Sequence, residues 1–230
     1  MILFMIPHAG GSAKTYCSFK RNLPDNIRIV PMEVAGRTSR AEDPFCASIQ
    51  ECAADLLKRH KDDIANEKYA LFGHSMGTMI AAELVSQIKD QGLPEPEHVF
   101  LSGRFAVDEL YNIIPVKDPT DEQIVDFFVE HHMLPDAVTQ NADILAMFSR
   151  ILCADVRMTD GYQISADKAK FNCDISIMYG EDDELLNYSD MSGWKRFAGK
   201  GCTFHAFPGG HFYHMDDKAA FCKVIADAIG

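Results

Sequence analysis

Short apolar runs alternate with longer stretches of helical spacing along most of the chain. The sequence predicts six strands, over residues 1–6, 27–32, 69–72, 99–101, 175–179 and 202–207. Apolar positions recur every three or four residues, as in an amphipathic helix, over residues 45–65, 76–89 and 215–229. Strands that alternate with helices need crossover connections, which produce a mostly parallel sheet with helices on both faces. The pattern therefore predicts an α/β fold.

This alternation is interrupted once. Between the strand that ends near Ser102 and the strand that begins near Cys173 lie about seventy residues without a strand pattern, which is uncommon for a structureless connection. Two helical patterns occupy this stretch. One begins at a capping box formed by Thr120 and Gln123, and the other begins near Asn141. We therefore expect a helical insertion and not a long loop.

We interpret this insertion, at about residues 105–165, as a lid on a single domain that spans residues 1–230. A chain of this length buries enough surface to hold a core without disulfides or a structural metal. His131 and His132 lie in the insertion and are expected at its surface.

Composition and charge narrow the possible functions. The chain has 230 residues, 47% hydrophobic and 24% charged, as in ordinary globular proteins. Its net charge of −12 would repel nucleic acids and anionic membrane surfaces, so neither is an expected partner. Residues 1–7 lack the basic flank of a signal peptide, and no segment approaches the ~20 apolar residues of a membrane span. Seven widely spaced cysteines indicate free thiols, and we expect a cytoplasmic monomer.

The segment from Gly73 to Gly77 carries a G-x-S-x-G sequence around Ser75. It lies where a predicted strand meets a predicted helix, which is the setting of a nucleophile elbow. The two glycines let strand, turn and helix approach closely around a strained serine, and the helix N-terminus favours developing negative charge. We therefore expect Ser75 to be a catalytic nucleophile; the alternative is a plain strand–helix turn.

A serine hydroxyl needs a base, and His211 is the first candidate. It follows two glycines in the loop after the last strand, at the same sheet edge as Ser75. His214 is the rival, expected to face the start of the last helix, while His74 should point away from the serine. His211 and His214 could instead hold a metal, but no third ligand has suitable spacing, so no metal is expected.

The base in turn needs a carboxylate to orient it. The strand over residues 175–179 is followed by four acidic residues at 181–184, most of which suit a solvated turn. We favour Asp183 over Asp182 because a Gly-x-x-Asp spacing carries the acid past the tight turn. The resulting order of serine, acid and histidine along the chain is that of α/β-hydrolases.

An acyl-transfer site must also stabilise an oxyanion beside the serine. The backbone N–H of Met76 is one expected donor. The second should come from the glycine-rich loop after the first strand, residues 7–11, where we favour Ala9 and keep His8 as the alternative. This loop has no G-x-G-x-x-G fingerprint, so no dinucleotide cofactor is expected.

Several segments together resemble the external type II thioesterases of nonribosomal peptide and polyketide synthases. In the family's order and at similar intervals, the chain carries PHAGG at 7–11, GR with a second arginine at 36–40, LFGHSMG at 71–77, SGR at 102–104 and FPGGHF at 207–212. The resemblance covers nearly the whole chain and is more specific than G-x-S-x-G alone. It implies an α/β-hydrolase fold whose helical insertion is a mobile lid over an acyl pocket.

The same resemblance implies an activity. The family hydrolyses aberrant or stalled acyl and aminoacyl groups from the 4′-phosphopantetheine arm of carrier protein domains, which would be the partners. That arm belongs to the substrate, and no cofactor is implied. Ser75, His211 and Asp183 would be nucleophile, base and orienting acid, with Met76 and Ala9 in the oxyanion hole.

Contact with a carrier protein should be apolar or local, because carrier proteins are usually acidic like this chain. Lid residues that could supply it, most of them expected to be buried within the lid, are Phe127, Phe128, Met133, Leu134 and Met147. Arg37, Arg104 and Arg150 are candidates for the phosphate of the arm, or ordinary ion-paired residues.

Two positions depart from the family, and two other functions stay open. Ala35 replaces the proline that usually precedes the Gly-Arg pair, and Glu184 stands where proline often follows the acid. A free-standing carboxylesterase for small esters would use the same triad, and only the family resemblance separates it from a thioesterase. A catalytically silent binding protein is disfavoured because all three triad residues are present.

Overall fold

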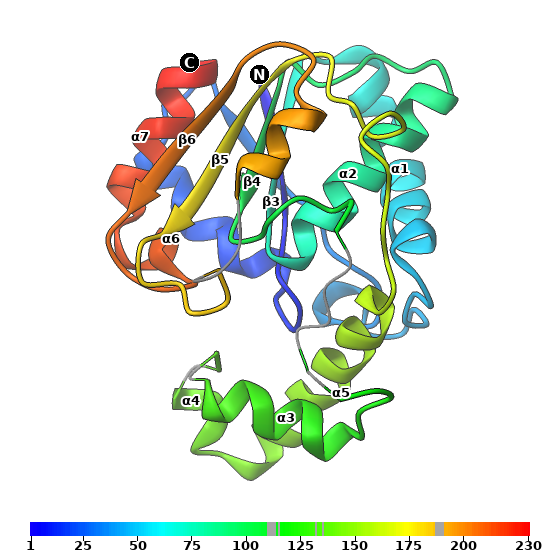
Figure 1. Ribbon diagram of the computed structural model, residues 1–230, viewed down its shortest axis with the longest axis vertical. Helices are drawn as coiled ribbons and strands as arrows, with labels where there is room; N and C mark the ends of the chain where they lie inside the picture. The colour runs from blue at the N-terminus through cyan, green and yellow to red at the C-terminus, as the bar shows by residue number, and fades with distance from the viewer. Residues whose placement is uncertain (110–113, 115, 132, 135, 187–190) are drawn as a thin grey trace.

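The computed structural model describes residues 1–109, 114, 116–131, 133–134, 136–186 and 191–230 (Figure 1). Within them, one sheet has the strand order β2-β1-β3-β4-β5-β6, and every neighbouring pair is parallel. Its strands are β1 (Ile2–Ile6), β2 (Arg28–Pro31), β3 (Tyr69–His74), β4 (His98–Ser102), β5 (Asp174–Gly180) and β6 (Cys202–Phe207). The predicted parallel α/β fold is therefore confirmed.

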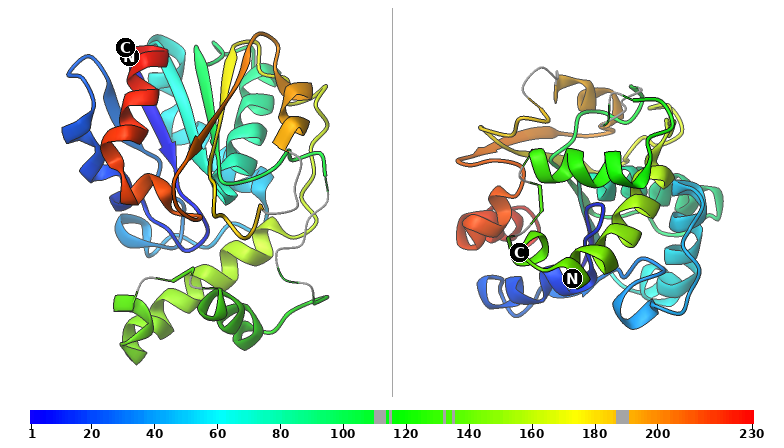
Figure 2. Two further views of the ribbon diagram at one scale, coloured as in Figure 1. Left: turned by 60° about the vertical axis from the view of Figure 1, so that its left-hand side comes forward. Right: turned by 90° about the horizontal axis from the view of Figure 1, so that it is seen from below.

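Helices cover both faces of this sheet. One face packs against α1 (Ile49–Asn66) and α2 (Met76–Asp90), and the other against α7 (Lys218–Ile229) and the 3-10 helix η1 (Ala13–Asn22) (Figures 1 and 2). Side chains of β1 alternate between the two layers, because successive residues of a strand point to opposite faces. The shorter elements are η2 (Thr38–Arg40), η3 (Met191–Phe197) and α6 (Tyr213–Asp216).

Three helices between β4 and β5 form a separate layer. They are α3 (Asp121–Glu130), α4 (Asp136–Thr139) and α5 (Ala142–Thr159), and they lie beyond the carboxyl ends of the strands (Figures 1 and 2). Thr120 and Gln123 form the predicted capping box, and the Asn141 side chain caps α5. Helices α3 and α5 share a small apolar cluster that includes Ile124, Phe128 and Leu152. The helical insertion thus lies over the edge where the loops after the strands meet.

Two helices differ from their predicted bounds. The helix expected from residue 45 begins at Ile49, because the Ser48 side chain caps it by accepting the N–H of Glu51. The single helix expected over residues 215–229 is divided at Asp217, whose side chain caps α7 by accepting the N–H of Ala220. No helix of the described part of the chain is long and apolar enough to cross a membrane.

Candidate active site

Ser75 occupies a sharp turn between β3 and α2. Its backbone angles, φ 53° and ψ −115°, are strained for a residue with a side chain. A Cβ on Gly73 would lie 2.2 Å from the carbonyl oxygen of Gly77, and a Cβ on Gly77 would lie 2.4 Å from that of Ile6. The N–H of Ser75 donates to the carbonyl of Ser102 at 2.8 Å, which ties the turn to β4. This is the elbow geometry that the G-x-S-x-G sequence predicts.

His211 and Asp183 meet from neighbouring loops, one after β6 and one after β5. Nδ1 of His211 and Oδ2 of Asp183 are 2.7 Å apart, and since an ionised carboxylate can only accept, Nδ1 is the donor. The other carboxylate oxygen accepts the N–H of Leu185 at 3.1 Å, and Asp183 is only 2% exposed. Asp182 is exposed. The structure therefore places Asp183, and not Asp182, against His211.

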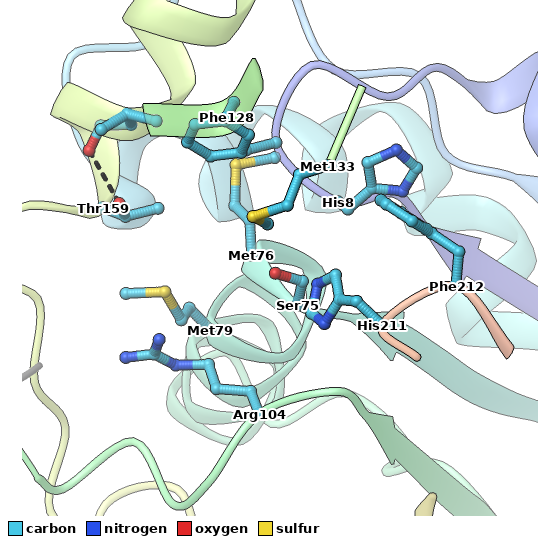
Figure 3. Close-up of a pocket in the computed structure, with 12 residues that line it drawn as sticks. His8, Ser75, Met76, Met79, Arg104, Phe128, Met133, Thr159, His211 and Phe212 are labelled. Atoms are coloured by element: carbon cyan, nitrogen blue, oxygen red, sulfur yellow. Dashed lines mark hydrogen bonds between the residues drawn. The ribbon is translucent and has the colours of Figure 1, made fainter. Parts of the chain in front are cut away.

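Ser75 and His211 face the same pocket (Figure 3). Nε2 of His211 is buried and has no hydrogen-bond partner among the described residues, so it is the ring nitrogen available to a group in the pocket. The described contacts hold no hydrogen bond between Ser75 and His211; catalytic pairs often tighten only in the complex with substrate. Much of the remaining wall is apolar and consists of Met76, Met79, Phe128, Met133, Val156 and Phe212.

Two backbone segments bring N–H groups to this pocket. Met76 begins α2, and N–H groups in the first turn of a helix have no acceptor within it. In the loop after β1, Gly10 donates its N–H to Asp155, and Gly11 donates to a carbonyl of the same loop. Ala9 lines the pocket, and its N–H has no acceptor among the described contacts. The structure thus brings both predicted donor residues, Met76 and Ala9, to the pocket that Ser75 faces.

Three further histidines lie around His211 and are neutral at pH 7. The ring of His74 is 4.7 Å from that of His211 and 4.3 Å from that of His214, between centroids. Burial lowers the pKa of His8 to about 3, and it lowers the pKa of both His74 and His214 well below the ordinary value. His214 is fully buried among aromatic rings and does not line the pocket. His8 lines the pocket beside Ala9.

A second serine–histidine pair lies in the interior. Oγ of Ser102 is 2.9 Å from Nδ1 of His74 and 2.6 Å from the hydroxyl of Tyr213. All three side chains are buried, with Ser102 at 0% exposure. This buried network stabilises the strand–helix turn at Ser75. Because Ser102 is fully buried, an acyl group in the pocket cannot reach its hydroxyl.

The three arginines considered for the phosphate are in different surroundings. Arg37 is buried and forms an ion pair with Asp155, which removes it from contact with a phosphate. Arg104 lines the pocket, and Arg150 is exposed on α5.

Asp155 was not predicted from the sequence to have a role at the site. The signal that could have identified it is an acidic residue on the buried face of an amphipathic helix, next to Val156. His131 is exposed, as expected, and His132 lies outside the described residues.

Fold and site together define a serine hydrolase of the α/β-hydrolase class. The chain belongs to the thioesterase domain family, whose profile, described as "Thioesterase domain", matches residues 1–229. The resemblance found in the sequence is therefore confirmed at the level of family, fold and enzyme class.

Named relatives support the same assignment. The chain is 27% identical over 221 residues to the gramicidin S biosynthesis protein GrsT of Aneurinibacillus migulanus, covering 94% of this chain and 84% of that protein. It is 28% identical over 217 residues to the medium-chain S-acyl fatty acid synthase thioesterase of Homo sapiens, covering 93% and 81% respectively. The crystal structure of ClbQ from the colibactin NRPS/PKS pathway matches with a TM-score of 0.88 and 28% identity, covering 99% of this chain and 96% of that one.

Proposed function

We propose that this thioesterase hydrolyses aberrant or stalled acyl and aminoacyl groups from the 4′-phosphopantetheine arm of carrier protein domains in a nonribosomal peptide or polyketide synthase. One observation carries the proposal: Ser75 and the Asp183-bound His211 converge on one largely apolar pocket in a chain of the thioesterase domain family. The named relatives include a gramicidin S biosynthesis protein and a fatty acid synthase thioesterase, which supports a substrate held on a synthase.

In this proposal the reaction is two successive acyl transfers. Oγ of Ser75 attacks the thioester carbonyl while Nε2 of His211 takes its proton, and Asp183 holds the imidazole in the required tautomer. The N–H groups of Met76 and Ala9 bind the oxyanion of the tetrahedral intermediate. The thiolate of the arm, with an ordinary pKa near ~8.5, leaves with little help from an acid and takes up the proton held on Nε2 of His211, which restores the base. Water activated by His211 then releases the acyl group from the serine.

The helical insertion is assigned the role of a lid, at about residues 105–165 of one domain over 1–230. The supporting observation is that Phe128 of α3 and Val156 of α5 line the pocket, so an acyl chain bound there touches both helices. Met147 on α5 is 65% exposed and can meet a carrier protein, whereas Phe128, Met133 and Leu134 are buried.

Intact-protein mass spectrometry tests the activity directly. A carrier protein loaded with an acetyl or aminoacyl group is incubated with wild type, with Ser75→Ala and with Ser102→Ala, beside a parallel assay on a p-nitrophenyl ester. We expect loss of the acyl mass with wild type and Ser102→Ala, and retention of that mass with Ser75→Ala. The carrier reaction should outpace ester turnover at matched concentrations.

Two results would oppose the proposal. Ester turnover with the carrier protein left loaded would indicate a small-molecule carboxylesterase that uses the same site. Deacylation by Ser75→Ala at the wild-type rate would remove Ser75 as the nucleophile.

A further inference from the structure

A buried ion pair joins the body of the protein to the helical insertion. Arg37, in the turn after β2, makes two parallel hydrogen bonds to Asp155 on α5: Nη2 to Oδ1 at 2.5 Å and Nη1 to Oδ2 at 2.6 Å. The two side chains are 1% and 3% exposed. Paired bonds of this kind fix relative orientation as well as adding energy.

The same two side chains also hold the loop after β1. Oδ2 of Asp155 accepts the N–H of Gly10 at 2.8 Å, and Nη1 of Arg37 donates to the carbonyl of Gly11 at 3.0 Å. Phe148, from the same helix as Asp155, covers Gly10 so closely that a Cβ there would lie 2.6 Å from its ring. Asp155 and Phe148 of α5 therefore hold the loop at Gly10, the residue that follows Ala9.

Stability alone is a weak explanation for such a pair. Burying two charges costs desolvation energy that their attraction often fails to exceed, and apolar replacements of similar volume are frequently tolerated. What an apolar pair could not supply is an acceptor for the Gly10 N–H and a donor for the Gly11 carbonyl. The geometry therefore indicates a role in setting the conformation of this loop.

We propose that Arg37 and Asp155 are positioning residues, which hold the N–H of Ala9 in place as an oxyanion donor and couple that loop to α5. The inference rests on the proposed function for the role of Ala9. Val156 follows Asp155 on α5 and lines the pocket, so the helix that anchors the loop also forms part of the pocket wall. A shift of α5 with the acyl chain thereby changes the oxyanion site.

Two variants separate positioning from folding. Asp155→Asn keeps the side-chain shape but removes the charge and one oxygen acceptor. The double variant Arg37→Met/Asp155→Leu replaces the pair with apolar groups of similar volume and is expected to stay folded. Asp55→Asn is the matched control, because it removes an ion-pair partner of Arg40, at 2.6 Å, that does not touch the loop.

The decisive probe is an alkyl trifluoromethyl ketone. Oγ of Ser75 adds to its carbonyl carbon and the Ser75 proton passes to His211, so the carbonyl oxygen becomes an oxyanion and nothing leaves. We expect both test variants to lose on the order of 10²-fold in kcat, as when one oxyanion donor is removed, with KM close to wild type. Ketone affinity should fall in parallel, for ester and thioester assays alike, while Asp55→Asn keeps both values.

Three outcomes decide between the hypotheses. Folded variants that retain wild-type kcat and ketone affinity would overturn the positioning role, as would a change confined to KM or to thermal stability. If wild type leaves carrier proteins loaded while the variants still lose ester turnover and ketone affinity, the positioning role stands and the carrier-protein function fails. If Ser75→Ala still turns over the ester, the proposed site itself is wrong and the positioning role falls with it.

Discussion

Nδ1 of His211 lies 2.7 Å from Oδ2 of Asp183, across two loops that follow adjacent parallel strands. Close approach of these loops depends on Gly180, where a Cβ would lie 2.3 Å from the carbonyl oxygen of Gly210. The N–H of Asp183 donates a hydrogen bond to the carbonyl of Gly180. This turn directs the carboxylate of Asp183 inward, while Asp182 remains exposed. The pairing of acid and base is therefore set by a glycine contact between two strand ends.

Asp183→Asn should lower kcat for thioester hydrolysis by on the order of 10⁴-fold, as in other serine triads, because an amide favours the wrong tautomer of His211. Asp182→Asn is the matched control one residue away and should retain wild-type kcat. Steady-state kinetics on an acyl thioester measure both. Equal losses in the two variants would contradict the assignment of Asp183.

Ser75 and Ser102 can be distinguished by labelling. A fluorophosphonate should add to wild type and to Ser102→Ala but not to Ser75→Ala, with the adduct read by intact mass. Ser102→Ala should also lower the free energy of unfolding by about 1–3 kcal/mol, because His74 and Tyr213 lose their shared buried partner. Labelled Ser75→Ala would show that another residue is the nucleophile.

Most of the fold could be predicted because its signals are local. Strands covered on both faces appear as short continuous apolar runs, and the bounds of all six lie within two residues of the prediction. The caps at Thr120 and Asn141 are recognisable from neighbouring residues alone. The positions of Ser75 and His211 follow from where their motifs fall relative to strand ends.

What the sequence could not supply depends on contacts between distant segments. Arg37 and Asp155 are 118 residues apart, and neither spacing nor periodicity relates them. Only Tyr16 and Phe19 are buried among the ten residues of the 3-10 helix η1, and two apolar positions are too few to predict a helix. The apolar pattern predicts one continuous helix at the C-terminus, but the chain forms α6 and α7 because the Asp217 side chain caps a new helix there.

We expect burial of His214 to contribute to the sensitivity of the protein to acid. Its side chain is fully buried, and burial is the main cause that lowers its pKa well below the ordinary value. In the unfolded chain the same group titrates near ~6.5. Below that pH the unfolded state binds a proton that the native state does not, so the free energy of unfolding falls as pH decreases and is unaffected by this group above it.

His214→Leu should therefore flatten the acid dependence of stability. The slope of unfolding free energy against pH should decrease by up to about 1.4 kcal/mol per pH unit below neutrality, the effect of one proton. Urea denaturation of both proteins from pH 8 to pH 5 measures this, and pH 8 serves as the reference because the imidazole is then neutral in both states. Parallel curves over this range would assign the acid sensitivity to other groups.

Phe128 should determine how long an acyl chain the pocket accepts. It is 4% exposed and lines the pocket from α3, next to Met133 and Val156. Phe128→Val shortens the side chain but keeps the wall apolar, so the ratio of kcat/KM for hexanoyl over acetyl thioester should rise. Each extra methylene buried contributes up to ~0.8 kcal/mol, or about fourfold in this ratio.

Phe204→Ala, on the exposed side of β6, is the control and should leave the ratio of hexanoyl to acetyl turnover unchanged. An unchanged ratio in Phe128→Val would mean that the acyl chain follows the opposite wall, past Met79 and Arg104 (Figure 3).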